Sequence, residues 1–437
     1  QESDVNASGQ TYVAYLFAHN DGDGEFGPDG DQDIIKCGSY TGTGSTNGPE
    51  IDLGFEPQWV MVKRADGGSE HWAIIDNMRQ MISLESNNAR MLKPNNSEAE
   101  EAVGFANPLA TGFKVNRNEG VTNASGSTYI YMAIRRGPLA APESATDVFA
   151  IDQGDTTSTD PQFISNFPVD MAITRYVAGS AEHNLGSRLT GATYGQTQNP
   201  NAFSSDNDFT WDYMNGWYAS TRNTSHYSWM WKRAPSYFDV VAYTGDGSGV
   251  RTINHNLGVA PEMIWIKGRN ATMSWIVYHA SLGNDYVMRL EQTSAASSGS
   301  SLYWNNTDPT SSVWTINSNL NTSGRNYIAY LFATVAGVSS VGSYSGNGST
   351  TGPIVDCGFS SGARFVLIKR TDSTGDWVVH DTVRGITAGD DKTLKLNSTA
   401  AETTGQVLNP HSSGFQLATA DSFANASGGT YIYYAIA

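Results

Sequence analysis

The sequence has only two cysteines, Cys37 and Cys357, among its 437 residues. They lie far apart and in different sequence contexts. A framework of disulfide bonds, of the kind that staples small secreted domains, is therefore excluded. A lone cysteine in an apolar segment usually behaves as a small hydrophobic side chain, and we expect both to be buried rather than to act as ligands or nucleophiles.

Basic residues are scarce. Lys and Arg number 26 against 43 Asp and Glu, which gives a formal net charge of -17. No run rich in Lys or Arg occurs, so the positive surface that binds phosphate backbones or anionic membranes is missing, and nucleic acid is excluded as a partner. No stretch approaches the roughly 18 apolar residues of a membrane-spanning helix, so membrane insertion is not expected.

Helical periodicity is also missing. No window shows a sustained apolar period of 3.6 residues, so long helices are not expected. Glycine is abundant instead, at 45 residues, and hydrophobic residues make up 39% of the chain. Short segments rich in Val, Ile, Tyr, Trp and Phe alternate with turn residues. This pattern predicts an all-β protein with many short strands.

One phrase recurs along the chain in four close copies and one degenerate copy. It reads DVNASGQTYVAYLFA at residues 4 to 18, VTNASGSTYIYMAI at 121 to 134, NLNTSGRNYIAYLFA at 319 to 333, FANASGGTYIYYAIA at 423 to 437 and, degenerate, RNTSHYSWMW at 222 to 231. The copies lie about 100 residues apart, the size of one small β domain. Such self-similarity predicts tandem repeats, each ending in this phrase as a strand.

Each interval contains further recurring phrases in the same order. A Gly-rich opening turn comes first, and then a hydrophobic strand that ends in a basic residue, such as PQWVMVKR at 57 to 64 and ARFVLIKR at 363 to 370. We expect these basic residues to extend past the strand end or to pair with an Asp of a neighbouring repeat. A strand that begins near a tryptophan follows. Roughly seven or eight strands per repeat predict a β-sandwich of jelly-roll-like form.

We therefore expect about four tandem sandwiches, which we call modules 1 to 4. Their predicted bounds are residues 34 to 136, 148 to 233, 238 to 335 and 338 to 437. Module 2 is the most divergent, because it lacks the Gly-rich opening turn and carries a different set of aromatic residues.

Four modules need four closing strands, yet residues 4 to 18 supply a fifth. We interpret residues 1 to 33 as the closing strand of an upstream module followed by an acidic Gly/Asp linker. The start at Gln1, without a basic and then apolar leader, fits a processed product or a piece of a longer one. An unpaired strand of this hydrophobicity is an aggregation-prone edge, so the alternative is its donation to a neighbouring subunit.

Several phrases resemble an uncharacterised β-rich repeat domain of tailed-phage virion proteins, especially those of marine phages such as cyanophages. They are NASGSTYIYMAI, LGFEPQWVMVKRAD, SYTGTGSTNGP and GVAPEMIWIKGRNATMSWIVYH. The resemblance covers nearly the whole chain outside module 2. It implies a tail fibre, spike or similar appendage on the virion surface, with other virion proteins and further copies of the chain as partners, and it carries no catalytic residues. Coiled-coil heptads and collagen-like triplets are missing, so the sequence itself does not indicate a trimeric shaft.

The loop HNDGDGEFGPDGDQD at residues 19 to 33 is a candidate cation site. Ca²⁺ binds several carboxylate and carbonyl oxygens on a flexible loop, and the candidate ligands are Asp21, Asp23, Asp29 and Asp31. The EF-hand pattern fails, because Ile34 stands where glycine is needed. The alternative is a solvated acidic linker that binds no ion.

Module 2 contains a concentration of aromatic residues between residues 207 and 231. Tyr213, Trp217 and Tyr218 lie among Asn, Asp and Gly in a turn-like setting, and flat aromatic faces stack on sugar rings and anchor interfaces. We therefore predict these three as a site for a glycan or protein partner. The alternative is that the aromatic residues alternate into a sandwich core.

Catalysis is not expected. The eight histidines form no zinc-binding spacing, and no nucleophile elbow or β-helix repeat stands out. The leading hypothesis is a non-enzymatic phage virion protein, a tail-fibre or spike type of appendage that attaches to a host surface. The alternatives are a capsid-decorating or other architectural virion protein, and a secreted bacterial carbohydrate-binding array.

Overall fold

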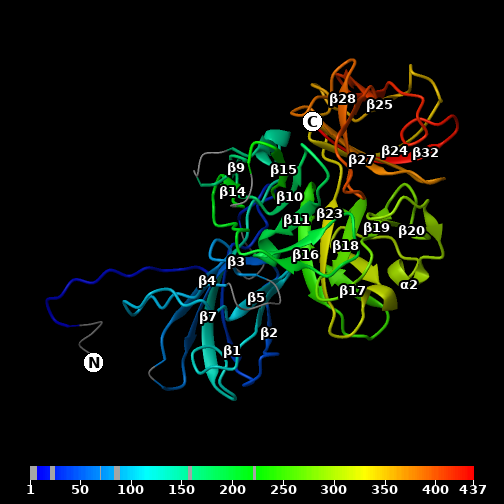
Figure 1. Ribbon diagram of the computed structural model, residues 1–437. Helices are drawn as coiled ribbons and strands as arrows, with labels where there is room; N and C mark the ends of the chain where they lie inside the picture. Colours follow the sequence, from blue (N-terminus) through cyan, green and yellow to red (C-terminus); the bar gives the residue numbers. More distant parts are fainter. Residues whose placement is uncertain (1–6, 20–24, 69, 83–88, 156–159, 220–222) are drawn as a thin grey trace.

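The computed structural model describes residues 7–19, 25–68, 70–82, 89–155, 160–219 and 223–437. These residues form strands joined by turns, three short 3-10 turns and the single-turn helix α2 (Ser301–Trp304). Neighbouring strands in the described sheets are antiparallel, and larger sheets are accompanied by smaller ones (Figure 1). The prediction of an all-β, sandwich-type fold is confirmed.

Within the part of the chain that the structure describes, no helix has the length and apolar character needed to cross a membrane.

Module 1 consists of a four-stranded and a three-stranded sheet. The larger sheet has the order β1 (Ile35–Thr41), β7 (Thr128–Arg135), β3 (Pro57–Arg64) and β4 (Ala73–Asp76), and the smaller has β2 (Glu50–Asp52), β6 (Gly112–Val115) and β5 (Ala106–Leu109). The recurring closing phrase forms β7, which lies between β1 and β3. Both edges of β7 are bonded to neighbouring strands, and Tyr129, Tyr131 and Ala133 on one of its faces pack in the core of module 1, whereas Ile130 on the other face is exposed.

Modules 3 and 4 repeat this order and extend it at one edge. In module 3 the larger sheet is β16 (Phe238–Thr244), β23 (Asn326–Phe332), β18 (Met263–Gly268), β19 (Ile276–His279), β20 (Tyr286–Arg289) and β21 (Ser297–Ser298), and the smaller is β17 (Arg251–Asn254) and β22 (Val313–Ile316). In module 4 the larger sheet is β24 (Ser339–Ser345), β32 (Thr430–Ile436), β26 (Phe365–Arg370), β27 (Trp377–Asp381), β28 (Asp391–Lys395) and β29 (Thr403–Gly405), and the smaller is β25 (Ile354–Asp356), β31 (Gly414–Leu417) and β30 (Leu408–His411).

Module 2 keeps the larger sheet but has a much reduced second sheet. The larger sheet is β13 (Ser204–Ser205), β12 (Thr193–Gln196), β11 (His183–Ser187), β10 (Met171–Tyr176), β15 (His226–Trp231) and β8 (Phe149–Gln153), and the smaller pairs β14 (Gly216–Trp217) with β9 (Phe163–Ile164). The degenerate closing phrase forms β15, which again lies beside the opening strand of its module.

The repeated asparagine of the closing phrase is a buried structural residue. Asn123, Asn321 and Asn425 are fully buried, and each accepts a hydrogen bond from the opening turn of its own module, for example from the Thr43 amide at 2.7 Å and from the Asn347 amide at 2.8 Å. The asparagine therefore joins the first and last turns of a module, which explains why it recurs.

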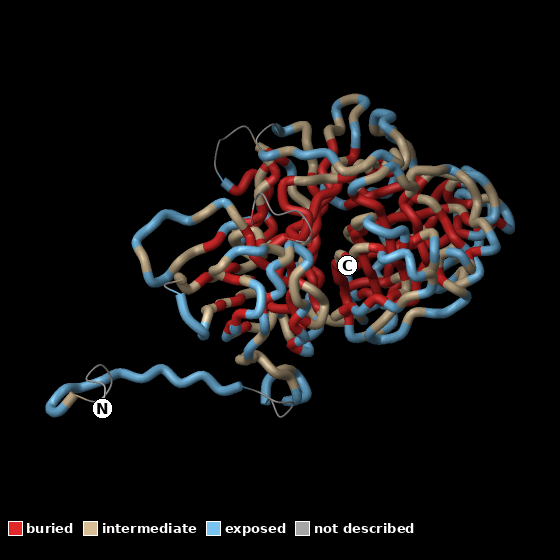
Figure 2. Tube along the Cα trace, turned by 90° about the horizontal axis from the view of Figure 1, so that it is seen from below, coloured by how far each residue is buried: buried red, intermediate tan, exposed pale blue. Residues whose placement is uncertain are grey.

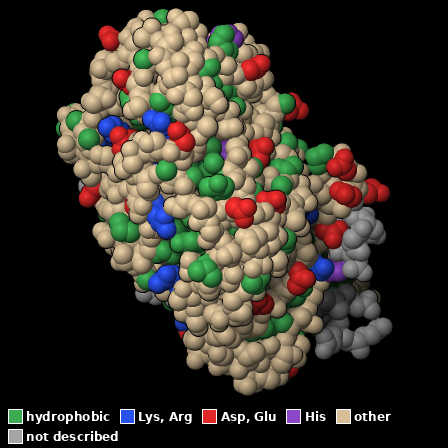
Figure 3. Space-filling model, turned by 90° about the vertical axis from the view of Figure 1, so that its right-hand side faces the viewer, with side chains coloured by type: hydrophobic (Ala, Val, Ile, Leu, Met, Phe, Trp, Pro, Cys, Tyr) green, Lys and Arg blue, Asp and Glu red, His purple; other side chains and the backbone are tan. Residues whose placement is uncertain are grey.

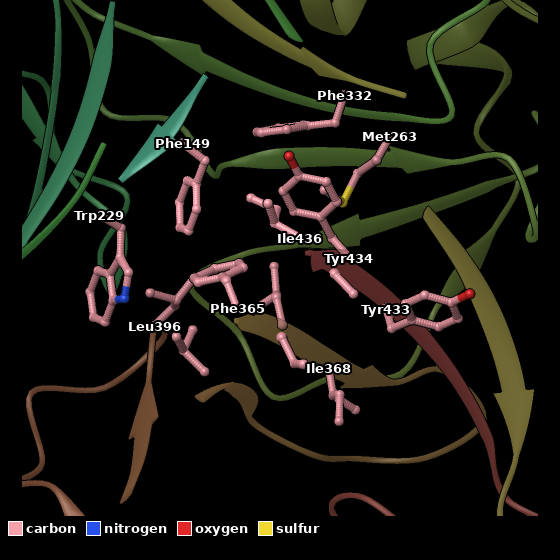
Figure 4. Close-up of a cluster of buried hydrophobic side chains, with 14 of the residues drawn as sticks. Phe149, Trp229, Met263, Phe332, Phe365, Ile368, Leu396, Tyr433, Tyr434 and Ile436 are labelled. Atoms are coloured by element: carbon pink, nitrogen blue, oxygen red, sulfur yellow. The ribbon is translucent and has the colours of Figure 1, made fainter. Parts of the chain in front are cut away.

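Alternation along the strands of modules 2, 3 and 4 serves two cores. In β18, Ile264 and Ile266 face the core inside module 3, whereas Met263 and Trp265 face a core that modules 2, 3 and 4 share. Figure 4 shows this shared core, with Phe149 of module 2 and Tyr434 of module 4 on either side of Phe365 (Figure 4). The ring centroids of Phe149 and Phe365 are 5.4 Å apart. The three modules are therefore packed into one body.

Equivalent basic residues at the ends of β10, β18 and β26 connect these modules in a cycle. Arg175 of module 2 donates to Ala400 O of module 4 at 2.6 Å. Lys369 of module 4 donates to Thr293 O and Ser294 O of module 3, each at 3.0 Å. Lys267 of module 3 donates to Pro200 O of module 2 at 2.7 Å, which closes the cycle. For Lys369, whose sequence setting predicts extension past the strand end or pairing with an Asp, the structure instead shows binding to carbonyl groups of the next module.

The leading segment, residues 7 to 18, forms no strand within this chain. It keeps the turn of the other closing phrases, because the Ala7 amide donates to the Tyr12 hydroxyl at 2.6 Å, as the Ala124 amide does to Tyr129 at 2.8 Å. Beyond the turn it extends away from the body with its apolar side chains exposed, Leu16 by 92% (Figure 2). Its pairing with a strand outside this chain stays a prediction.

The two cysteines differ in burial. Cys357 is buried in module 4, as expected, but Cys37 of β1 is only partly buried. The expectation for Cys37 was wrong because the outer face of the larger sheet of module 1, unlike those of modules 2, 3 and 4, is not part of the shared core.

Candidate functional site

A groove of about 750 Å³ lies between modules 1 and 3. In Figure 1, β5 of module 1 and β16 of module 3 lie side by side where the two modules meet. The lining residues come from the opening loop and smaller sheet of module 1, and from the first two strands and opening loop of module 3. They are residues 46, 47, 50, 107 to 111, 114 and 116 on one side, and 241 to 246 and 251 to 254 on the other.

Strand alternation makes the walls of the groove polar. In β17, Ile253 points into the core of module 3, whereas Thr252 and Asn254 are exposed. Opposite them, Asn47 is exposed at the opening loop of module 1, and the Asn116 amide donates to Asn107 Oδ1 at 2.8 Å. The walls therefore offer amide and hydroxyl groups, which both donate and accept hydrogen bonds.

Charged groups in the groove are paired. Lys114 Nζ lies 2.9 Å from Glu50 Oε1, and Arg251 Nη1 lies 3.7 Å from Asp246 Oδ2. Hydrogen bonds from Ser248, then from Asn321, with the charge of Arg251 adding to them, lower the pKa of Asp246 to about 2. Asp246 is therefore a carboxylate at neutral pH. With both signs of charge present in pairs, the groove does not favour an anion or a cation.

The molecular surface beyond the groove carries little concentrated positive charge on the side that Figure 3 presents, where the basic side chains are few and scattered among uncharged atoms (Figure 3).

A buried ion network fixes the two walls of the groove. Arg233, in the connection between modules 2 and 3, donates to Glu56 of module 1 through both terminal nitrogens, at 2.7 and 2.5 Å, and to Asp239 of module 3 at 2.7 Å. Nearby, the Asn256 amide of module 3 donates to Ala110 O of module 1 at 3.0 Å. All three charged side chains are almost fully buried.

The network favours the ionised form of Asp239. Burial alone would raise the pKa of Asp239, but the charges of Arg233 and Arg136, together with hydrogen bonds, outweigh that effect and hold the pKa below its ordinary value. Removing either partner of such a pair leaves a buried, uncompensated charge. The contact between modules 1 and 3 is therefore sensitive to the loss of any single member.

The aromatic site predicted in module 2 is partly wrong. Trp217 is fully buried in the core of its module, where its indole N–H donates to Ser228 Oγ at 2.9 Å and its ring stacks on Trp211 with centroids 5.0 Å apart. No ring face remains for a ligand, because the short sheet of β9 and β14 is packed mainly by these large side chains. Tyr213 and Tyr218 are half-buried, and their role as a ligand site stays a prediction.

The acidic loop is only partly described. Asp21 and Asp23 lie outside the described residues, and Asp29 and Asp31 are exposed. Among the described residues no group of three or more His, Cys, Asp or Glu side chains is arranged to hold a metal ion. Calcium binding by the loop stays a prediction.

Sequence reasoning missed the groove, because its walls come from segments that lie more than 100 residues apart. The exposed residues of VRTINHN, at 250 to 256, gave a weak signal, since polar residues alternate there with buried ones. Nothing local predicted which module would lie opposite them.

Comparison with known proteins gives no match among curated proteins and none among solved structures. A family described as a domain of unknown function (DUF7483) matches residues 1–138 and 172–437. The unmatched residues, 139–171, hold β8 and β9 and so include the beginning of the divergent module 2. Because the match covers most of the sequence, the chain belongs to the DUF7483 family.

Proposed function

We propose that this chain is a non-catalytic segment of a phage virion appendage of the tail-fibre or spike type, and that it binds a host-surface glycan in the groove between modules 1 and 3. The observation that carries the proposal is the groove itself, whose walls are polar and whose charges are paired. The phage setting follows from the sequence resemblance described above.

The chemistry of the groove suits an uncharged oligosaccharide. Sugar hydroxyl groups both donate and accept hydrogen bonds, and the amides of Asn47, Asn116 and Asn254 can supply both partners. A volume of about 750 Å³ falls within the usual range for ligand sites. An anionic or cationic ligand would instead meet a paired opposite charge and gain little.

The frame of the groove supports the same proposal. Its walls belong to different modules, but the Arg233 network joins them through buried contacts. A preformed site loses less conformational entropy on binding than one that must be assembled. Weak affinity for each site is compatible with attachment, because many copies on one particle gain by avidity.

A glycan array probed with labelled full-length protein tests the proposal. Asn254→Ala combined with Thr252→Ala should abolish binding without unfolding the chain, since both side chains are exposed. Tyr213→Ala, which changes the other candidate site, is the matched control and should bind normally. Binding that survives the double substitution but disappears in Tyr213→Ala would place the site in module 2 instead, and the lack of any glycan ligand would argue against attachment.

An architectural role in the virion is the second candidate. It is favoured by the leading segment, whose exposed apolar residues have the chemistry of a strand that pairs with another chain. Locating this chain in the assembled particle separates the candidates, because an attachment protein should project from the tail and a decorating protein should cover the head. Finding no particle-bound copies would favour a secreted bacterial array.

A further inference from the structure

Modules 2, 3 and 4 contact one another through equivalent parts. Besides the cycle of Arg175, Lys267 and Lys369, two tryptophans at the start of equivalent strands reach into the next module. The Trp275 indole donates to Gln196 O of module 2 at 2.9 Å, and the Trp377 indole donates to Arg289 O of module 3 at 3.0 Å. Each module thus presents the outer face of its larger sheet to its neighbours in the same way.

Module 1 has the same parts in the same register. Lys63 pairs with Ile130 as Lys267 pairs with Ile328. The Trp72 amide donates to the Asn95 side chain at 3.0 Å, as the Trp377 amide does to Asn397 at 2.8 Å. Module 1 therefore builds the contact face that the other modules use.

Among the residues that the structure describes, no other module covers this face. Ile130 is 43% exposed, whereas its equivalents Ile328 and Ile432 are 0% and 2% exposed in the shared core. Trp72 is half-buried, whereas Trp275 and Trp377 are fully buried. Lys63 Nζ donates at 2.6 Å to Glu70 O of its own module. Within the described part of the chain, Lys63 makes no bond to another module that would correspond to the bonds of Lys369 with module 3.

The apolar residues of the face form a continuous surface. We call it the open face, and we define it by Trp59, Met61, Trp72, Ile74, Ile130 and Met132. The pairs Met61–Met132 and Met61–Ile74 place these side chains on adjacent strands of one sheet face. A contiguous apolar surface of this kind normally marks an interaction site.

We propose that the open face of module 1 binds the open faces of two further copies of this chain, so that three copies form a cyclic trimer through their first modules. The cycle of modules 2, 3 and 4 is the template, because three equivalent faces related head to tail already close there. A head-to-tail contact repeated between identical chains forms a ring when its rotation closes. The proposal goes beyond the glycan-binding function and does not depend on it.

The template names the contacts between copies. The carbonyl groups that receive bonds from the neighbouring module belong to Thr293, Thr399 and Pro200. Each of these residues lies five positions after the strand residue whose pairing corresponds to that of Leu92 with Ile74 in module 1. The equivalent acceptor in module 1 is therefore Ser97. Lys63 of one copy therefore donates to Ser97 O of the next. By the same register, the Trp72 indole donates to Lys93 O of the next copy.

A second copy suits the open face better than an unrelated protein. Covering it requires both apolar side chains opposite Ile130 and free carbonyl groups opposite Lys63 and Trp72. Module 1 itself supplies both kinds of group at the right register, as modules 2, 3 and 4 do for one another. The leading segment also carries apolar side chains, but it extends away from the body of the chain (Figure 2).

Light scattering during size exclusion tests the proposal with full-length protein. The wild-type chain should have three times the mass of its 47.0 kDa monomer. Ile130→Glu places a carboxylate in each of the three contacts and should raise the concentration of half-association by about a hundredfold or more. Because Ile130 is already exposed, this variant should stay folded, which a thermal unfolding curve verifies. Ile164→Glu, at an isoleucine of module 2 that is 51% exposed, is the matched control and should remain a trimer.

Two outcomes would overturn the proposal. One is a monomeric or dimeric wild-type chain at micromolar concentration. The other is a trimer that survives Ile130→Glu but dissociates when Leu16 and Phe17 are both changed to Asp, since the leading segment would then hold the copies together. Protection of Trp72 fluorescence from a soluble quencher, lost in Ile130→Glu, would confirm the face.

Discussion

Trp229 of module 2 donates its indole N–H to the carboxylate of Asp381 of module 4 at 2.9 Å, and both side chains are fully buried. The same carboxylate accepts a bond from Arg384 at 2.6 Å, and the guanidinium of Arg384 lies over the Trp229 ring. A charged group is thus shared across the boundary between two modules, in the interior of the shared core. The modules of this body are joined by specific polar contacts as well as by apolar packing.

Replacing Trp229 by Phe should test this bond. Asp381 would lose one donor but keep Arg384, so we expect the free energy of unfolding to fall by about 1–3 kcal/mol more than the change in side-chain size explains. The matched control is Trp265→Phe in the same shared core, because the Trp265 indole has no hydrogen-bond partner among the described residues. Urea unfolding of both variants gives the comparison. Equal losses would mean that the bond contributes nothing.

Lys369→Met should separate module 4 from module 3. It removes the donor that the carbonyl groups of Thr293, Ser294 and Gly375 share. Thr293 O keeps the bond from the Gly375 amide, and we expect a loss of about 1–3 kcal/mol from the part-buried acceptors that lose their donor. Lys392→Met is the control, because Lys392 donates to Thr404 at the exposed edge of the same module and its loss should cost less than about 1 kcal/mol. Similar urea midpoints for the two variants would contradict a joining role for Lys369.

His380 should make stability depend on pH. Burial, with the charge of Arg384 adding to it, lowers the pKa of His380 to about 3, whereas the unfolded chain titrates near 6.5. The unfolded state therefore binds a proton that the folded state does not bind. The stabilising contribution of the neutral, buried His380 is fully present above pH 6.5 and is lost as the pH falls toward 3. Between pH 7 and pH 5 the loss from one such histidine is about 2 kcal/mol.

His380→Ile gives the measurement, since Ile75 occupies the equivalent position of module 1. The difference in unfolding free energy between pH 7 and pH 5 should shrink by about that amount. His279, whose pKa burial lowers to about 4, should keep part of the dependence in the variant. An unchanged pH dependence would show that His380 titrates normally in the folded chain.

Glu56→Gln should loosen module 1. The substitution removes a buried negative charge from Arg233, and breaking a buried pair from one side costs about 3–5 kcal/mol. Glu50→Gln, which breaks the exposed pair with Lys114, should cost less than about 1 kcal/mol. Limited proteolysis of the connection between modules 1 and 2, at residues 137 to 144, should accelerate only in Glu56→Gln. Equal proteolysis of both variants would mean that the network does not hold module 1 in place.

The sequence by itself determined the strands, their order and the turns that join them. The alternation of apolar residues in PEMIWIKGR and ARFVLIKR placed β18 and β26, and the closing phrases placed β7, β23 and β32. Such patterns are local, since side-chain period and turn chemistry depend on neighbours along the chain. They predicted the all-β fold.

What covers each strand face was decided only by the tertiary structure. The sequences of β3 and β26 alternate alike, yet Phe365 and Leu367 lie in the shared core while Trp59 and Met61 remain half-exposed. The polar neighbours of Trp217 predict a ligand residue, but Trp217 packs inside module 2. The groove likewise joins residues more than 100 positions apart. An apolar side chain indicates that its face must be covered, but the identity of the cover depends on contacts between distant segments, which local pattern does not encode.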